Sequence, residues 1–119
     1  MSAIHHVAVE TPRGQVDACV AFWGLLGFEP VAPAGPLGEI AAWVEREGQQ
    51  IHLLFSDEPT VPAQAHVAVV CPDYDATVER LRAAGFDVVP RREHWGSPRC
   101  AVRDPAGHRV EVMRFPPSR

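Results

Sequence analysis

The sequence predicts an α+β fold built from two copies of one module, strand–helix–strand–strand–strand (βαβββ). Three internal matches predict it, occurring in the same order with offsets of 60, 58 and 59 residues. Self-similarity at a nearly constant offset is the signature of a repeated structural unit. The matching segments are residues 6–9 with 66–69, residues 27–29 with 85–87, and residues 50–53 with 109–112.

The length of 119 residues fits one small domain that holds both copies. We interpret residues 1–119 as a single domain with a first module over 1–56, a linker over 57–64 and a second module over 65–119. The linker region is rich in proline and polar residues, which is typical of a connection between folded elements.

In the first module, residues 4–9 alternate between two faces as a strand does. Apolar residues then recur at helical spacing from Val16 to Leu26, and Gly27 ends that pattern as a helix stop. Three extended segments complete the module. They are residues 28–33, 39–46 and 49–55, the last two joined by a tight turn at 47–48.

The second module repeats this order. A strand over 66–70 is followed by a helix that starts at Pro72 and Asp73 and stops at Gly85. Residues 104–107, Asp-Pro-Ala-Gly, form the turn between the last two strands. The extended segments are residues 86–91, 97–103 and 109–115.

Composition and charge exclude one large class of function. The chain has 11 basic and 15 acidic residues, a net charge of −4 and no lysine. Proteins that bind nucleic acids through backbone phosphates need a basic surface. A hydrophobic fraction of 46% and a charged fraction of 22% are typical of a folded globular chain. The sequence therefore favours a globular protein that does not bind nucleic acid.

Neither a membrane span nor a leader sequence is indicated. The uncharged segment 19–28 is too short to cross a bilayer and contains two glycines, and the first residues lack the basic and apolar regions of a signal peptide. We expect a cytoplasmic protein with no membrane partner. Cys19, Cys71 and Cys100 are odd in number and scattered, so we expect small buried side chains rather than disulfides.

Strand alternation assigns four ionisable residues to one face. In the first strand of each module, valines alternate with His6 or His66, and in the last strand, apolar residues alternate with His52 or Glu111. A face of valine, isoleucine and leucine is expected to lie buried under the module's helix. The four ionisable side chains therefore point from the opposite face, at positions that correspond through the repeat.

This ligand set predicts a metal site if the two sheets curl so that these faces meet. A buried carboxylate and imidazoles are costly unless they are paired or bind a cation. Three histidines and one glutamate suit Zn, Ni, Co, Mn or Fe(II) without choosing among them. We predict one divalent metal ion per site, held by His6, His52, His66 and Glu111.

Four segments resemble the vicinal oxygen chelate superfamily, the group of glyoxalases, bleomycin-resistance proteins and extradiol dioxygenases. They are residues 6–9, 22–28, 81–86 and 104–111. The resemblance covers nearly the whole chain and implies paired βαβββ modules in a cupped mixed sheet, often completed between the subunits of a homodimer. That family places its metal ligands on the first and last strands of each module, which map onto His6, His52, His66 and Glu111.

Comparison with subfamilies leaves the reaction open. Glyoxalase I and methylmalonyl-CoA epimerase are similar in filling all four ligand positions, although glyoxalase I has Glu where this chain has His52. Extradiol dioxygenases resemble this chain through the triad His6, His66 and Glu111, which leaves coordination positions open for catechol and oxygen. A fourth ligand, His52, would close one of these positions. Fosfomycin thiol transferases share that triad, but their phosphonate-binding Tyr maps onto Ala101.

Further residues are expected around the substrate. Alternation puts Trp43, Leu54 and Met113 on the ligand face as an apolar wall, with Ala101 beside them and Arg99 placed to clamp an anionic group. His5 is expected to point away from His6 and not to bind the metal. The predicted substrate-binding residues are Trp43, Leu54, Arg99, Ala101 and Met113.

The leading functional hypothesis is a metal-dependent enzyme of lyase or isomerase type. The ion would chelate adjacent oxygens of a small substrate, with Glu111 as the catalytic proton shuttle. A metal-free binding protein for a drug or metabolite, as in the bleomycin-resistance members, is the alternative. An Fe(II) extradiol-type dioxygenase is a second alternative. The expected partners are a small-molecule substrate and a second copy of the chain.

Overall fold

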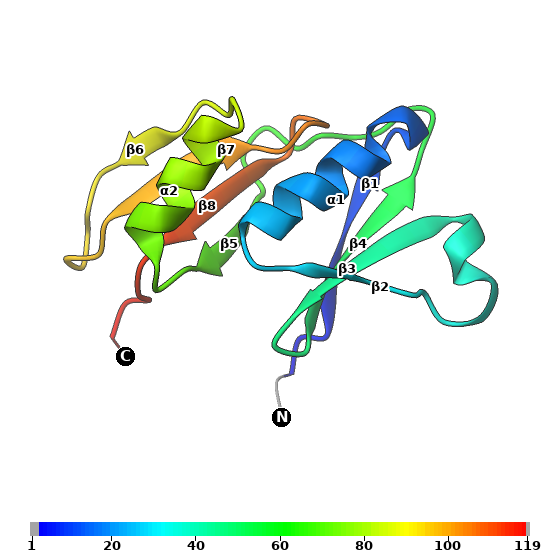
Figure 1. Cartoon of the computed structure of the whole chain (residues 1–119), viewed down its shortest axis with the longest axis horizontal. Helices are drawn as coiled ribbons and strands as arrows, with labels where there is room; N and C mark the ends of the chain where they lie inside the picture. Colours follow the sequence, from blue (N-terminus) through cyan, green and yellow to red (C-terminus); the bar gives the residue numbers. More distant parts are fainter. Residues whose placement is uncertain (1–2, 119) are drawn as a thin grey trace. The chain divides into compact units, whose positions relative to one another are not determined.

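The computed structural model describes residues 3–118 and divides the chain into two compact units. Unit 1 is Met1–Val61 and unit 2 is Pro62–Arg119. Each contains one helix and one four-stranded mixed sheet (Figure 1). The predicted α+β class and the two βαβββ units are therefore confirmed. No helix among the described residues is long and apolar enough to cross a membrane.

The two units have the same topology. Sheet order is β1-β4-β3-β2 in unit 1 and β5-β8-β7-β6 in unit 2, with the first and last strands parallel and the other pairs antiparallel. Unit 1 consists of β1 (His6–Thr11), the 3-10 turn η1 (Arg13–Gln15), α1 (Val16–Leu25), β2 (Glu29–Val31), the 3-10 turn η2 (Gly35–Glu39), β3 (Ala41–Arg46) and β4 (Gln49–Phe55). Unit 2 consists of β5 (Val67–Val70), α2 (Tyr74–Ala83), β6 (Val89–Arg91), β7 (Arg99–Arg103) and β8 (Arg109–Met113).

Both helices end in the same capping structure, and the repeated Gly-Phe pair explains why. Gly27 and Gly85 each have a φ of +91°, a left-handed conformation that glycine adopts without strain. The amide of Phe28 donates to the carbonyl of Trp23 at 3.1 Å, and the amide of Phe86 donates to that of Leu81 at 3.0 Å. These bonds are the 6→1 contacts of a Schellman motif.

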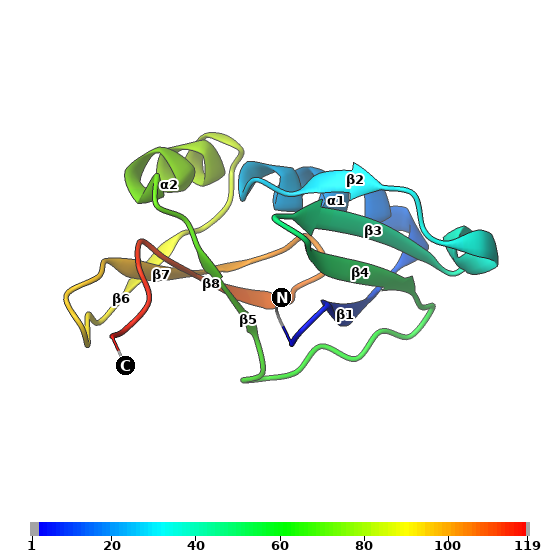
Figure 2. The ribbon, with the colours of Figure 1, turned by 90° about the horizontal axis from the view of Figure 1, so that it is seen from below.

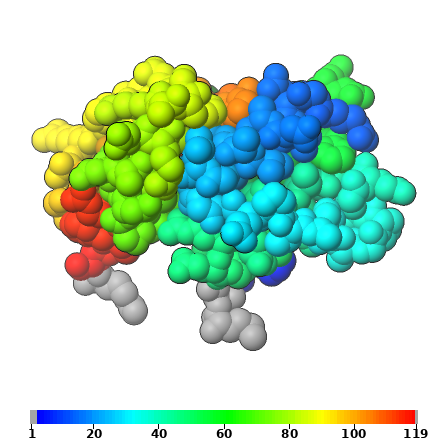
Figure 3. Space-filling model, viewed as in Figure 1, coloured from blue at the N-terminus to red at the C-terminus, as the bar shows by residue number. Residues whose placement is uncertain are grey.

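Each helix covers one face of its own sheet (Figures 1 and 2). In the space-filling view α2 hides most of the unit 2 sheet behind it (Figure 3). The apolar residues under the helices are almost fully buried, and burial of one such side chain contributes about 1.5–3 kcal/mol. The core residues of unit 1 include Cys19, Phe22, Trp23, Leu26, Val44, Ile51 and Leu53, and those of unit 2 include Val69, Cys71, Leu81, Cys100, Val102, Val110 and Val112.

All three cysteines are buried thiols, as predicted. One packing expectation was wrong: Val7 is 38% exposed instead of buried. The reason is that β1 is an edge strand, whereas α1 packs mainly on β2, β3 and β4.

Several predicted strands begin or end at other residues. The segment 39–46 loses its start to η2, where Pro36 sits in the first turn. The segments 28–33, 86–91, 97–103 and 109–115 shorten to β2, β6, β7 and β8. By contrast, β4 has the predicted bounds and β1 begins and ends two residues later than expected.

We call the sheet face opposite the helix the open face of each unit. Register places side chains on it in cross-strand rows, because paired residues point to the same side. One row of unit 1 is Ala8, His52, Trp43 and Val31, and its counterpart in unit 2 is Ala68, Glu111, Ala101 and Val89. The neighbouring row of unit 1 includes Gln50 and Glu45, which correspond to Arg109 and Arg103.

Candidate functional site

Three aromatic rings stack on the open face of unit 1. The His52 ring lies between the rings of His6 and Trp43, with centroid separations of 3.8 Å and 4.0 Å and interplanar angles of 10° and 4°. The register explains the contact, because His52 is paired with Trp43 on β3 and lies next to the β1 row that contains His6. The predicted ligand His52 therefore has both ring faces covered.

Hydrogen bonds fix the orientation of the His52 ring. Its Nε2 lies 2.8 Å from Oε1 of Gln50, and Nε2 of Gln50 donates to Oε1 of Glu45 at 2.8 Å. Because an amide oxygen only accepts, His52 carries its proton on Nε2 and leaves the Nδ1 lone pair free. Burial, together with the nearby His6 and His5, lowers the pKa of His52. The ring is thus held neutral, the form in which histidine binds metals.

His5 does not point away from His6, which corrects the prediction. It precedes β1, so strand alternation does not apply to it, and its Nδ1 lies 3.0 Å from Nδ1 of His6. Three ring nitrogens, one from each of His5, His6 and His52, lie within 4.8 Å of one another. A third histidine therefore joins the predicted pair in unit 1. The adjacent His-His pair was the sequence signal, but the predicted strand began two residues too early and therefore included His5 in the alternation.

Unit 2 brings together His66 and Glu111. Nε2 of His66 lies 3.4 Å from Oε2 of Glu111, and Nδ1 of His66 lies 2.7 Å from the carbonyl of Gln64. A carbonyl only accepts, so Nδ1 carries a proton. In the neutral ring the lone pair of Nε2 then faces Oε2 of Glu111, so two acceptors lie side by side. A proton or a cation between these two atoms removes their mutual repulsion.

This pair fits the chemistry of a metal half-site. Histidine ligands characteristically donate their other nitrogen to a backbone carbonyl, as His66 does to Gln64. Two donors on one tetrahedral ion, each at about 2.0–2.2 Å, are separated by about 3.4 Å. The separation of His66 Nε2 and Glu111 Oε2 has that value.

Arg99 occupies the other oxygen of Glu111. Its Nε donates to Oε1 at 2.5 Å, and its Nη1 donates to the carbonyl of Arg92 at 2.7 Å. The guanidinium also lies 5.6 Å from the ring centroid of Trp95. Arg99 was predicted to clamp an anion of the substrate, and in this structure its anionic partner is Glu111. The signal was available, because Arg99 is the diagonal neighbour of Glu111 across β7 and β8.

The structure thus groups the four predicted ligands into two pairs, one in each unit. His6 and His52 share the open face of unit 1, while His66 and Glu111 share that of unit 2. Their assignment as ligands of one metal remains a prediction.

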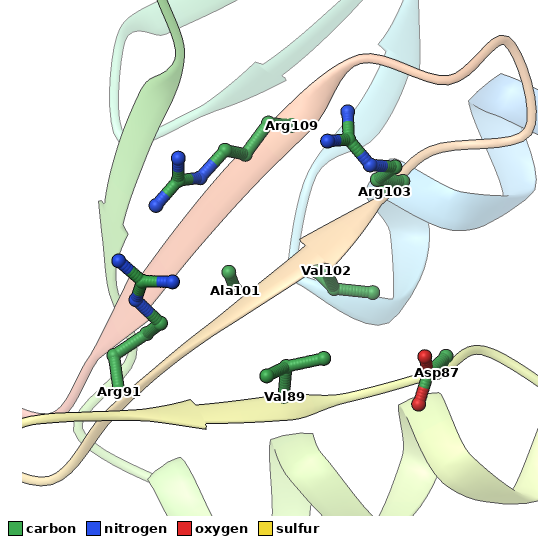
Figure 4. Close-up of a pocket in the computed structure, with 7 residues that line it drawn as sticks. All are labelled: Asp87, Val89, Arg91, Ala101, Val102, Arg103 and Arg109. Carbon is green, nitrogen blue, oxygen red and sulfur yellow. The ribbon is translucent and has the colours of Figure 1, made fainter. Parts of the chain in front are cut away.

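The predicted substrate-binding residues differ in exposure. Trp43 and Leu54 are half-buried and Met113 is buried on its strand. Ala101 lines a pocket of about 280 Å³ on the open face of unit 2 (Figure 4). The pocket is lined by Asp87, Val89, Arg91, Ala101, Val102, Arg103 and Arg109.

A duplicated βαβββ unit with histidine and glutamate on the open faces defines the class: a two-module protein of the vicinal oxygen chelate type. Residues 6–113 match the model of the glyoxalase-like domain, and the chain belongs to that family. No curated protein matches the chain.

Solved structures agree with this assignment. A glyoxalase family protein from Bacillus anthracis is 27% identical with a TM-score of 0.85, over 95% of this chain and 94% of that one. A lactoylglutathione lyase from Agrobacterium tumefaciens is 25% identical with a TM-score of 0.72, over 95% and 93%. TnmS3, an antibiotic binding protein from Streptomyces sp. CB03234, shares the fold at 19% identity and a TM-score of 0.72, over 95% of each chain.

Proposed function

We propose that this glyoxalase-like protein is a metal-dependent enzyme of lyase or isomerase type that acts on a small, oxygen-rich molecule. The observation that carries the proposal is the pairing of His66 Nε2 with Glu111 Oε2 at 3.4 Å, with Nδ1 of His66 held by a backbone carbonyl. Its repeat counterpart, His6 beside His52, supplies two further imidazoles.

The residues that would hold the ion are His6, His52, His66 and Glu111. A bound divalent ion supplies a Lewis acid that polarises adjacent substrate oxygens and stabilises developing negative charge. The ion could be Zn, Ni, Co, Mn or Fe(II), since imidazole and carboxylate ligands suit all five.

The chain's own residues orient the groups that react. Arg99 donates to Oε1 of Glu111, which fixes the carboxylate plane and turns Oε2 toward His66. Glu111 is the residue proposed to accept and return the substrate proton, because its carboxylate is buried on the open face. Arg99 acts through Glu111 and is a positioning residue.

Elemental analysis of untagged protein tests the metal. We expect about one ion per site in the wild type and its loss in His66→Ala, because the variant removes the imidazole that lies 3.4 Å from Glu111. His94→Ala is the matched control, since His94 is exposed in the loop between β6 and β7. Full metal occupancy in His66→Ala, or none in the wild type after incubation with each divalent ion, would overturn the proposal.

A metal-free binding protein is the second candidate, and the stacked rings of His6, His52 and Trp43 favour it. A flat aromatic surface stacks well on planar ligands. The fold is shared with an antibiotic binding protein. In this case planar antibiotics would quench tryptophan fluorescence saturably, chelator would not alter the quench, and Trp43→Leu would abolish it. Quenching that disappears with chelator would argue against this candidate.

A homodimer in the cytoplasm is proposed from the resemblance to the superfamily. Size-exclusion chromatography with light scattering tests the mass of the assembly. A strictly monomeric protein at micromolar concentration would contradict it.

A further inference from the structure

The pocket of unit 2 combines an apolar floor with several cationic side chains in its lining. Its floor is formed by Val89 and Ala101 on the open face. At the equivalent position of unit 1 stands Trp43, which fills that surface by stacking on His52. The exchange of Trp for Ala across the repeat leaves a hollow of about 280 Å³ in unit 2.

Three arginines surround this hollow. Arg91 comes from β6, Arg103 from β7 and Arg109 from β8, and the guanidinium of Arg109 extends toward that of Arg91 above Ala101 (Figure 4). Asp87 is the only acidic residue of the lining. The three cations enclose an apolar floor.

These guanidiniums lack acidic partners. Among residues 3–118, none of the three forms an ion pair, and Arg103 donates only to the carbonyl of Gly107 at 3.0 Å. The Nε atom of Arg109 is buried without a hydrogen-bond partner. Holding like charges close together costs free energy, and so does leaving a buried donor without a hydrogen bond. An anion bound between the guanidiniums would reduce both costs.

We propose that this pocket binds an oxyanion, a carboxylate or phosphate group, of a small ligand. Arginine is the side chain whose planar donors match the geometry of such groups. Ala101 is the direct cross-strand partner of Glu111, so the anion would sit beside the residue proposed to move the proton. That this ligand is the substrate rests on the proposed function, and it narrows the substrate class to small organic acids and phosphate esters.

Calorimetric titration of metal-free protein in low-chloride buffer tests the pocket. Malonate and inorganic phosphate are the probes, and neutral malonamide is the matched uncharged ligand. Metal-free protein is required because malonate also chelates metals. We expect saturable binding of at least one anion and none of malonamide, and the preferred anion distinguishes carboxylate from phosphate ligands.

Variants locate the binding. Arg109→Gln and Arg91→Gln should each weaken anion binding by about tenfold or more, since each removes charged hydrogen bonds. Arg82→Gln is the matched control, because Arg82 is exposed on α2, on the other side of the sheet. Unchanged affinity in the Arg91→Gln, Arg109→Gln double variant, or no anion binding by the folded wild type, would overturn the assignment.

Elemental analysis of the same variants separates this inference from the proposed function. The double variant should retain its metal, because neither arginine is among the proposed ligands. Loss of anion binding with metal retained supports the pocket. Anion binding by a protein that takes up no metal supports the pocket and overturns only the enzyme proposal.

Discussion

The two units share one topology and differ in charge. Unit 1 contains two basic and eight acidic residues, a net charge of −6, whereas unit 2 contains nine basic and seven acidic residues, a net charge of +2. The difference reaches the open faces. Gln50 and Glu45 in one unit occupy the positions of Arg109 and Arg103 in the other.

The two units share the packing on the helix side of the sheet. Buried apolar residues on β4 and β8, and a glycine with positive φ after each helix, are present in both. On the open face, His6 and Ala8 recur as His66 and Ala68. The residues at the positions of Trp43, Gln50 and Glu45 differ in unit 2 while the topology stays the same. The comparison teaches that the two units have the same packing under the helix, whereas the open face of each unit carries a different set of polar residues.

The largest expected effect comes from the shared core. Leu53 and Val112 are equivalent and fully buried. Leu53→Ala should lower the free energy of unfolding by about 2–5 kcal/mol, because it leaves a cavity under α1. Val112→Ala should cost less, roughly 1.5–2.5 kcal/mol, since fewer carbons are lost. Denaturant unfolding measures both, and an equal loss in the two variants would contradict this order.

The helix caps sharpen the comparison at an intermediate size. Gly27→Ala and Gly85→Ala should each destabilise the protein by about 1–2 kcal/mol, because alanine is strained at a φ of +91°. The matched control is Gly24→Ala within α1, where an added Cβ meets nothing within 4 Å. That control should be neutral or stabilising. Thermal unfolding measures the stability of the three variants. A Gly85→Ala variant as stable as the wild type would show that the two helix caps do not contribute equally.

The smallest expected effect is a pH dependence that arises from His52 of unit 1. The lowered pKa of His52 means that folding favours its neutral form. Its contribution to stability is therefore complete above the unfolded value of 6.5 and is lost as pH falls below it. Metal-free wild type should lose more stability between pH 7.5 and 5.5 than His52→Gln. His94→Gln is the control and should lose stability as the wild type does. A steeper loss of stability in His52→Gln than in the wild type would contradict the prediction.

The fold was predictable from the sequence because its signals are periodic. Alternation predicted the face of His6, His52 and Glu111 within their strands, and the Gly-Phe pairs marked both helix ends. His66 lies one residue before β5 and meets Glu111 on the same face. Strand bounds were less predictable where prolines and 3-10 turns interrupt them, as at η2. The exchange of Trp43 for Ala101 within the repeat was visible in the sequence, but the pocket beside Ala101 was found only in the structure.

The partners of the site residues were harder to predict. His5 approaches His6 through the backbone that precedes β1, and alternation says nothing there. Arg99 contacts Glu111 instead of lying free, and that choice depends on side-chain conformation. His66 pairs with the backbone carbonyl of Gln64. Every residue has such a carbonyl, so the identity of residue 64 gave no indication of the contact.

In each unit the first strand pairs with the last, which has a consequence for the order of folding. His6 and His52 are 46 residues apart in sequence, and His66 and Glu111 are 45 apart. Closing such loops costs chain entropy before any contact repays it, so local helices and hairpins form sooner. We expect each pair of proposed ligands to assemble late, when the first and last strands of its unit meet. Metal uptake during refolding would then report the completion of each sheet and lag behind helix formation.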